Sequence, residues 1–274
     1  AGTFTSGGSE SIFLALQTAR DWARATKGIK EPNLVVPRTA HPAFSRAGHA
    51  LGIDVRRVPT TRNDFKADVG AIASKLDDNT IGIVGSAPCY PFGVFDPIRE
   101  LGALAQARGL WLHVDACVGG FLSPYVKRLG HTLPDWDFSV PGVTSISADL
   151  HKHGMAAKGA SLMMLRSREL KEKYQTFDFR EWERGPYVAW TMQGTRPGGA
   201  VAAAWATLQH LGDEGYLRCA RMIMDNKKGL LDGIARIPGL AVLEPSELSI
   251  FVTRSADPGL DIGAVSDAMG TRGW

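Results

Sequence analysis

Strand-like and helix-like segments alternate from Gly8 to Leu165, and this alternation limits the fold more than any other feature of the sequence. Short apolar runs rich in β-branched residues are separated by segments whose apolar side chains recur at helical spacing. Such alternation is typical of βαβ units, which build a mostly parallel sheet between helices. The pattern predicts helices at Gly8 to Lys27, Pro42 to Leu51, Phe65 to Leu76 and Pro97 to Arg108, and strands at Asn33 to Val36, Ile53 to Val58, Ile81 to Gly85, Leu110 to Val114, Val143 to Ala148 and Ala160 to Leu165.

The rest of the chain predicts connecting helices and the opening of a second domain. We expect a large α/β domain at residues 1–185 that lacks its N-terminal segment, a connecting region at 186–237, and an incomplete α+β domain at 238–274. The expected elements are a loop at Arg184 to Gly199, helices near Gly199 to Leu211 and Asp213 to Ala235, strands at Leu240 to Leu243 and Leu248 to Thr253, and a helix from Ile262.

The composition excludes several classes of function. Charged residues make up 22% of the 274 residues, the net charge is +3 and no run of basic residues occurs, so nothing indicates a nucleic-acid partner. The most apolar segments, Ile12 to Leu16 and Ala200 to Leu208, are shorter than the roughly 20 residues that cross a bilayer, so we expect no membrane span. Cys89, Cys117 and Cys219 are odd in number and far apart, which argues against a disulfide framework and favours a reducing, cytoplasmic location.

The two ends of the sequence indicate a fragment. The chain starts at Ala1, directly before a glycine-rich motif, and stops at Trp274 without a recognisable terminal element. We therefore expect the parent protein to continue at both ends, so membrane association of the parent stays open.

Lys152 lies in the stretch SISADLHKHG, which runs from Ser145 to Gly154 and begins as a strand pattern. A lysine at the end of a buried strand can reach into a cleft without placing its charge in the core. Its amine can condense with a carbonyl group, which makes Lys152 a candidate nucleophile. The alternative is an exposed loop lysine.

A glycine-rich motif, TSGGSES, runs from Thr5 to Ser11 and opens directly into the first predicted helix. Glycines allow close backbone approach, and amides at a helix N-terminus bind phosphate well. The motif matches neither the dinucleotide-binding glycine pattern nor the P-loop, because no lysine follows the glycines. A helix start capped by serine and glutamate is the alternative.

Asp115 ends a predicted strand in the stretch LHVDACVGGF, from Leu112 to Phe121. A carboxylate in this place can pair with a protonated pyridine nitrogen, and the alternative is a helix cap or a loop carboxylate. A phosphate site, an aspartate and a lysine at successive strand ends together match the three groups that hold pyridoxal 5′-phosphate, so we predict this cofactor.

The amino-acid sequences of four stretches resemble those of a known family. With these stretches the chain resembles the sphingosine-1-phosphate lyases, a family of fold-type-I pyridoxal-phosphate enzymes related to the group II decarboxylases, and we interpret it as a fragment of a bacterial member. The resemblance implies a mostly parallel seven-stranded sheet between helices, followed by a smaller α+β domain. The stretches are SAPCYPFGVFDPI at Ser86 to Ile98, HVDACVGGF at His113 to Phe121, SISADLHKHGMAAKGAS at Ser145 to Ser161 and GTRPGG at Gly194 to Gly199.

The resemblance also implies roles for single residues. Lys152 matches the lysine that binds the cofactor covalently, Asp115 matches the partner of its ring nitrogen, and His41 matches the histidine that stacks on its ring. From the sequence alone, without the resemblance to this family, we would interpret His41 as a helix-capping histidine. The residues that match contacts to the cofactor phosphate are Gly8, Ser9 and His151.

Three further residues complete the expected site. Cys117 is expected beside the cofactor, as a small packing residue rather than a nucleophile. Lys158 matches a second lysine implicated in catalysis or in holding the substrate phosphate. Thr195 stands in a loop that in this family reaches the cofactor phosphate of the partner subunit, so the resemblance implies a homodimer with the active site at the interface.

The implied reaction is the retro-aldol cleavage of a phosphorylated sphingoid base between C2 and C3, which yields a long-chain aldehyde and phosphoethanolamine. The base that takes the C3 hydroxyl proton stays open among Lys158, His41 and Lys152, since desolvation can bring the pKa of a lysine into a suitable range.

Two other functions stay open. A decarboxylase of glutamate or of an aromatic amino acid would use the same cofactor, but such enzymes usually have asparagine at or near Asp149 and tryptophan where His153 stands. A non-catalytic relative is disfavoured because Lys152 and Asp115 are both retained. Asp149, His151 and His153 alternate as metal ligands can, but no further ligand cluster accompanies them, so we predict no metal site.

Overall fold

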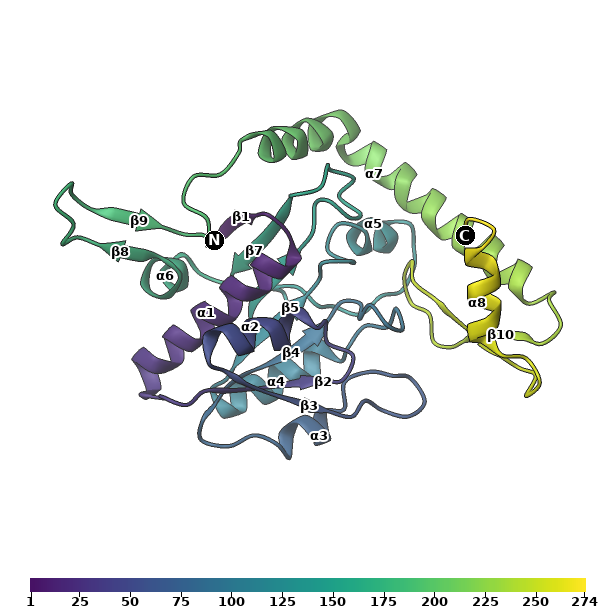
Figure 1. Cartoon of the computed structure of the whole chain (residues 1–274), viewed down its shortest axis with the longest axis horizontal. Helices are drawn as coiled ribbons and strands as arrows, with labels where there is room; N and C mark the ends of the chain where they lie inside the picture. The colour runs from purple at the N-terminus through teal and green to yellow at the C-terminus, as the bar shows by residue number, and fades with distance from the viewer.

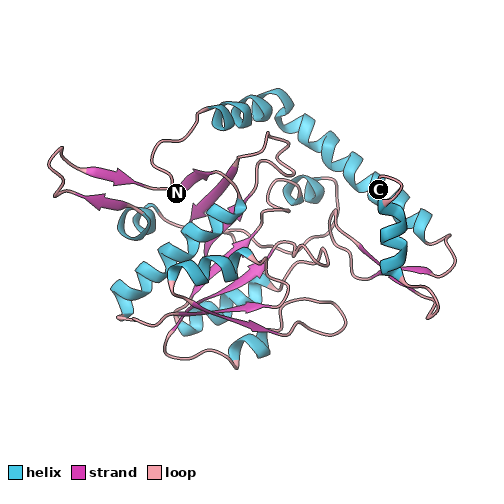
Figure 2. Cartoon of the chain, viewed as in Figure 1, coloured by secondary structure: helices cyan, strands magenta, loops and turns pink.

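The computed structural model describes residues 1–274, and its centre is a seven-stranded sheet (Figures 1 and 2). The strands of this sheet are β1 (Gly2–Thr5), β2 (Asn33–Pro37), β3 (Asp54–Val58), β4 (Thr80–Ser86), β5 (Trp111–Asp115), β6 (Val143–Ala148) and β7 (Ser161–Leu165). The helices around it are α1 (Gly8–Lys27), α2 (Ala43–Leu51), α3 (Val69–Ala73), α4 (Ile98–Arg108) and α5 (Ser123–Arg128).

The sheet has the order β1-β7-β6-β5-β4-β2-β3. The five strands from β3 to β6 are parallel, whereas β7 pairs antiparallel with β6 and β1 pairs antiparallel with β7. The predicted α/β fold with a mostly parallel seven-stranded sheet is therefore confirmed.

Helices cover both faces of the sheet, because its central strands are apolar on both sides. Strands β2 and β4 are buried along their whole length. Leu34 and Val36 of β2 belong to an apolar cluster with residues of α1 and α2, whereas Val35 belongs to a second cluster with residues of α3 and α4. In Figure 1, α1 and α2 lie over the near face of the sheet.

The strand register brings the ends of three parallel strands together. Ser86 at the end of β4 is paired with Asp115 at the end of β5, and Asp115 is paired with Ser147 near the end of β6. Ligands of open α/β sheets bind beyond these carboxyl ends. The same edge therefore collects the residues that the sequence analysis singled out.

The second half of the chain extends away from the sheet. Figure 1 shows a hairpin on one side of the sheet, the long helix α7 above it, and the small C-terminal unit on the other side. No helix is long and apolar enough to cross a membrane. The elements are α6 (Arg168–Leu170), a π-helical turn (Lys171–Gln175), β8 (Phe177–Phe179), β9 (Tyr187–Ala189), α7 (Gly199–Ile234), β10 (Leu240–Leu243), β11 (Val252–Ser255) and α8 (Ile262–Gly270).

Several predicted elements have different limits. The helix expected at Phe65 to Leu76 is reduced to α3, because Phe65 has φ 58° and Asp68 caps the helix start through a bond from the amide of Ala71. The loop expected from Arg184 contains β9, which pairs with β8. The strand expected from Leu248 begins only at Val252, and Leu248 is instead fully buried in an apolar cluster with residues of the seven-stranded sheet.

Two helices were expected around residue 212, and the structure has one kinked helix there. Gly212 inside α7 has φ 53° and ψ −172°, which no helical residue adopts. The kink separates the two expected segments, so the prediction of a break at this position is confirmed.

Candidate functional site

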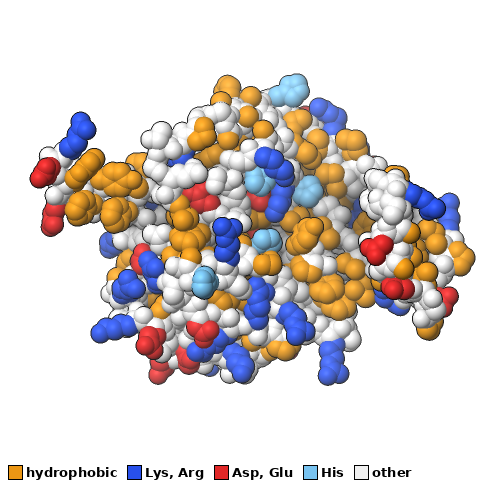
Figure 3. All heavy atoms as spheres, in the orientation of Figure 1, with side chains coloured by type: hydrophobic (Ala, Val, Ile, Leu, Met, Phe, Trp, Pro, Cys, Tyr) orange, Lys and Arg blue, Asp and Glu red, His pale blue; other side chains and the backbone are white.

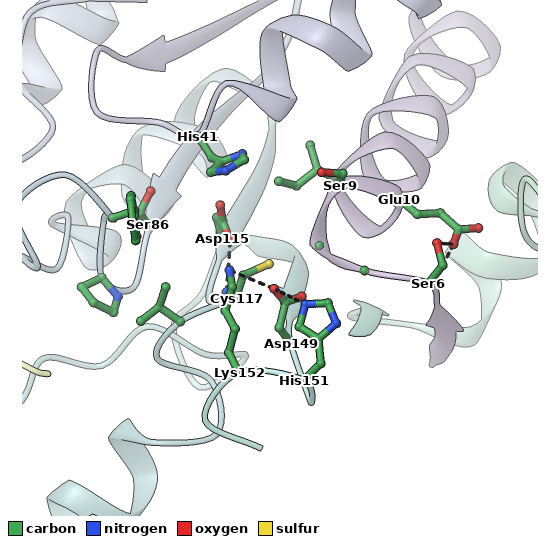
Figure 4. A pocket seen from close by; sticks show the side chains of 16 residues that line it. Ser6, Ser9, Glu10, His41, Ser86, Asp115, Cys117, Asp149, His151 and Lys152 are labelled. Carbon is green, nitrogen blue, oxygen red and sulfur yellow. Dashed lines mark hydrogen bonds and ion pairs between the residues drawn. The ribbon is translucent and has the colours of Figure 1, made fainter. Parts of the chain in front are cut away.

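A pocket of about 620 Å³ lies at the carboxyl ends of the parallel strands, between the start of α1 and the segments that follow β4, β5 and β6 (Figure 4). Its walls combine residues far apart in the sequence, from Ser6 to Lys152. The predicted site residues that line it are Gly8, Ser9, His41, Asp115, Cys117, His151 and Lys152.

Lys158 and Thr195 lie outside the walls of this pocket. Both side chains are exposed, and the ammonium of Lys158 lies 3.5 Å from the carbonyl oxygen of His151. The left-handed Gly159, with φ 94°, directs the chain from this point into β7. Lys158 is therefore not placed to contact a ligand in the pocket directly.

Lys152 and Asp149 form the central ion pair of the pocket. Lys152 Nζ lies 2.9 Å from Asp149 Oδ2, and His151 Nε2 lies 3.4 Å from the same oxygen. The second oxygen, Asp149 Oδ1, is buried without a hydrogen-bond partner. A buried carboxylate oxygen without a partner is unusual in a folded protein and marks a place where a ligand can bind.

The charge state of Lys152 differs from the expectation for a desolvated lysine. Burial lowers the pKa of the Lys152 ammonium, but the charge and hydrogen bond of Asp149 and the charge of Asp115 outweigh it and leave the pKa above its ordinary value. In this state Lys152 is charged, and it must lose a proton before it can act as a nucleophile.

Hydrogen bonds from the segment after β5 and from the neighbouring strand β6 hold the carboxylate of Asp115. Its Oδ1 accepts the backbone N–H of Cys117 at 3.0 Å and the hydroxyl of Ser147 at 3.2 Å. Only 9% of Asp115 is exposed, and in Figure 4 its carboxylate lies below His41. This leaves Asp115 Oδ2 as the oxygen that a ligand can approach.

Cys117 is a packing residue of the pocket wall. Burial, together with the carboxylates of Asp115 and Asp149, raises the pKa of its thiol well above the ordinary value. A thiol that stays protonated is a poor nucleophile, which agrees with the expectation from the sequence.

The start of α1 forms one side of the pocket. The amides of Gly8 and Ser9 open the helix and have no acceptor within it. A Cβ at Gly8 would lie 2.8 Å from Cys117 Sγ and 3.0 Å from each Asp149 oxygen, so only glycine fits. Glu10 accepts from the amide and the hydroxyl of Ser6 at 2.7 Å, but Ser6 precedes the N-cap residue Gly7, and no side chain caps the helix start itself.

His41 both caps a helix and lines the pocket. Its Nδ1 accepts the backbone N–H of Ala43 at 3.1 Å at the start of α2. As an acceptor Nδ1 carries no hydrogen, so the ring hydrogen lies on Nε2. The bond at the helix start agrees with the capping interpretation, whereas stacking of His41 on a cofactor ring stays a prediction.

Asp149 is the site residue that sequence reasoning missed, since it entered there as a candidate metal ligand and as a difference from the decarboxylases, not as a partner of Lys152. His153 Nδ1 instead lies 2.9 Å from the carbonyl oxygen of Val118, and no group of three His, Cys, Asp or Glu side chains is arranged to hold a metal ion. The sequence feature that could have revealed Asp149 as a partner of Lys152 is its position directly after β6 and three residues before Lys152.

Comparison with known proteins identifies the family. The profile described as "Pyridoxal-dependent decarboxylase conserved domain" matches residues 1–247. The chain belongs to the pyridoxal-dependent decarboxylase family. Its cofactor is accordingly pyridoxal 5′-phosphate, as predicted.

Individual members of the pyridoxal-dependent decarboxylase family resemble the chain along its whole length. It is 45% identical to a sphingosine-1-phosphate lyase of Arabidopsis thaliana over 100% of this chain and 49% of the relative. It is 36% identical to a probable L-aspartate decarboxylase of Thermococcus gammatolerans over 100% of this chain and 69% of the relative. The chain thus spans about half the length of the curated lyases that it matches.

A solved structure shows the same fold. The sphingosine-1-phosphate lyase of Burkholderia pseudomallei superimposes with a TM-score of 0.94 at 40% identity, over 100% of this chain and 61% of the other. This agreement supports the resemblance to lyases within the pyridoxal-dependent decarboxylase family.

The pocket fits the family's cofactor on its own chemistry. Free helix amides lie on one side, a carboxylate with one approachable oxygen lies at the bottom, and an amine lies opposite. These groups suit a phosphate, a pyridine nitrogen and an aldehyde, respectively. No Cβ fits at Gly8, so a glycine at this position keeps the space beside the helix amides open.

Proposed function

We propose that this chain is the cofactor-binding part of a lyase that cleaves a phosphorylated sphingoid base between C2 and C3. The observation that carries the proposal is the gathering of Lys152, Asp115 and the amides at the start of α1 around one pocket. The similarity to sphingosine-1-phosphate lyases over the whole chain supports the choice of substrate.

Different residues of the pocket would bind different parts of pyridoxal 5′-phosphate. Lys152 would bind its aldehyde carbon, Asp115 would pair with its ring nitrogen, and His41, which lies above Asp115 in Figure 4, would stack on its ring. The amides of Gly8 and Ser9 bind its phosphate, together with His151. When bound, the cofactor supplies an electron sink for the breaking bond.

In the proposed reaction the C3 hydroxyl loses a proton to a base and the C2–C3 bond breaks. C3 leaves as the aldehyde, and C2 takes up a proton, which gives phosphoethanolamine. Lys152 is the favoured base once its amine is uncharged, because its Nζ lies in the pocket, Lys158 lies outside it, and His41 Nδ1 is already occupied by the amide of Ala43.

A homodimer and a cytoplasmic location belong to the same proposal. The β8–β9 hairpin exposes apolar side chains, among them Phe177, Phe179 and Tyr187. Figure 3 shows orange side chains gathered on the projection that this hairpin forms at the left. A second copy of the chain would cover them and would receive Thr195 near its own pocket. The three cysteines are unpaired, which suits a reducing compartment.

An amino-acid decarboxylase is the second candidate. The observation that favours it is the 36% identity to the Thermococcus gammatolerans protein, of which the chain covers 69%. The cofactor-binding groups would be the same in both reactions.

Product analysis distinguishes the two candidates. The cofactor-loaded protein is incubated with sphingosine 1-phosphate and, separately, with aspartate, glutamate and an aromatic amino acid, and the products are identified by mass spectrometry. Phosphoethanolamine with a long-chain aldehyde supports the lyase. An amine formed with carbon dioxide supports the decarboxylase, and Lys152→Ala supplies the background rate.

A further inference from the structure

A chain of hydrogen bonds runs beneath the pocket and ends on Asp115. Trp111 Nε1 lies 2.7 Å from Ser145 Oγ, and His113 Nδ1 lies 2.8 Å from the same oxygen. His113 Nε2 lies 3.2 Å from Ser147 Oγ, which lies 3.2 Å from Asp115 Oδ1. These bonds form one continuous path across two strands.

The alternation of strand residues builds this path. Trp111, His113 and Asp115 occupy alternate positions on β5 and therefore share one face of the sheet. On the neighbouring strand β6, Ser145 is paired with His113 and Ser147 is paired with Asp115. Each side chain thus meets the next across the strand pair.

Burial forces the members of this path to bond with one another. His113 is 1% exposed, both serines are fully buried, and Trp111 is 2% exposed. Polar groups at such depth carry a large free-energy cost unless each has a partner. The two ring nitrogens of His113 have only the two serine hydroxyls.

The chemistry of the two ends sets the direction of most of these bonds. The Trp111 indole can only donate, and the Asp115 carboxylate can only accept. Ser147 gives its one hydrogen to Asp115, so it must accept from His113 Nε2. In a neutral ring with its hydrogen on Nε2, His113 Nδ1 accepts the hydrogen of Ser145, which in turn accepts from Trp111.

This direction requires a neutral imidazole with its hydrogen on Nε2. Burial lowers the pKa of His113 to about 4, so the ring is neutral at pH 7. The Asp115 charge favours the protonated ring but is the smaller of the two influences on this pKa. The charge state thus agrees with the bond directions.

We propose that His113 is a positioning residue that acts through Ser147 on Asp115. The Nε2–H of His113 keeps the Ser147 hydroxyl directed at Asp115 Oδ1, which fixes the orientation of the carboxylate and leaves Oδ2 for the ring nitrogen of the cofactor. The inference rests on the proposed function only for the role of Asp115 toward that nitrogen.

The bond directions are tested without the cofactor. Nitrogen-15 NMR of the imidazole rings in the cofactor-free chain identifies His113 as the signal absent from His113→Gln. The expected result at pH 7 is a neutral ring with its hydrogen on Nε2. A charged ring, or a hydrogen on Nδ1, overturns the proposal whether or not the chain proves to be a lyase.

Variants with bound cofactor test the effect on Asp115. Ser147→Ala and His113→Leu are expected to weaken the Kd for pyridoxal 5′-phosphate about tenfold, the size of one lost hydrogen bond to a charged group. Compared with His113→Leu, the His113→Gln variant is expected to regain most of the affinity for pyridoxal 5′-phosphate, because its amide N–H can occupy the position of the Nε2–H group.

The matched control is Ser123→Ala. Ser123 is a fully buried serine that accepts an indole N–H, from Trp136 at 2.9 Å, but it does not lead to Asp115. Thermal unfolding of each variant separates lost stability from lost affinity. Cofactor affinities of His113→Leu and Ser147→Ala equal to that of Ser123→Ala contradict the proposal.

Discussion

Lys152 Nζ lies 2.9 Å from Asp149 Oδ2, and Asp149 is a carboxylate whose other oxygen is buried without a partner. The pair keeps the lysine charged, as the raised pKa of Lys152 indicates. An ammonium cannot bind an aldehyde carbon, so Asp149 influences the pH at which Lys152 becomes a nucleophile.

Asp149→Asn is expected to lower the pH at which the cofactor binds covalently to Lys152. Removal of the carboxylate takes away the charge that favours the ammonium, so the pKa of Lys152 falls and more neutral amine is present at a given pH. The measurement is the rate of change in visible absorbance after pyridoxal 5′-phosphate is added across a pH series.

The control for this variant is Asp135→Asn. Asp135 Oδ1 lies 2.8 Å from Lys127 Nζ in an ion pair on the surface, away from the pocket. The same pH dependence in Asp149→Asn and Asp135→Asn would show that Asp149 does not govern Lys152.

Gly8→Ala is expected to weaken the binding of pyridoxal 5′-phosphate at least tenfold, or about 1.4 kcal/mol. The new Cβ would lie 2.8 Å from Cys117 Sγ and 3.0 Å from both oxygens of Asp149, so the start of α1 must shift. An absorbance titration gives the Kd.

Gly7→Ala is the matched control, because its Cβ would meet only His151 Cε1, at 3.4 Å. Its φ of 161° is extended backbone that alanine adopts. Equal loss of affinity in both variants would mean that crowding at Gly8 is not the cause.

The parallel part of the fold followed from the sequence because its signals are local. Helix α1 has the predicted limits, since glycine residues stand at both of its ends. Strand β6 has its predicted limits as well, because its apolar run is short and bounded. The domain limits at 185 and 237 stay predictions.

Features that depend on distant contacts did not follow. The Phe65 to Leu76 pattern looked helical, but the buried Asp96 takes the amide of Ala67 at 2.7 Å and holds that residue outside the helix. Asp149 was missed as a partner of Lys152, because a sequence does not show which way two neighbouring side chains turn. Its burial beside Gly8 appears only once α1 is packed on the strand ends.

His113 is expected to make the stability of the protein fall in mild acid. The pKa of His113 is about 4 in the folded protein and 6.5 is its ordinary value, so between these pH values the unfolded chain binds the proton and the folded chain does not. Stability is unaffected above pH 6.5, and as pH falls toward 4 it decreases by about 1.4 kcal/mol per pH unit, roughly 3 kcal/mol in all.

Denaturant unfolding at several pH values checks this expectation, with His113→Gln as the reference that cannot titrate. The free energy of unfolding of the wild-type protein should fall more steeply below pH 6.5 than that of the variant. Parallel curves would contradict the lowered pKa of His113.

The most direct test of the account is to locate the lysine that binds the cofactor. Pyridoxal 5′-phosphate is added to the protein, the covalent link is reduced with borohydride, and the peptides are sequenced by mass spectrometry. The account predicts the added mass on Lys152, which faces the pocket, and an unchanged extent of labelling in Lys158→Ala. Labelling at Lys158, or full labelling of the protein in Lys152→Ala, would contradict it.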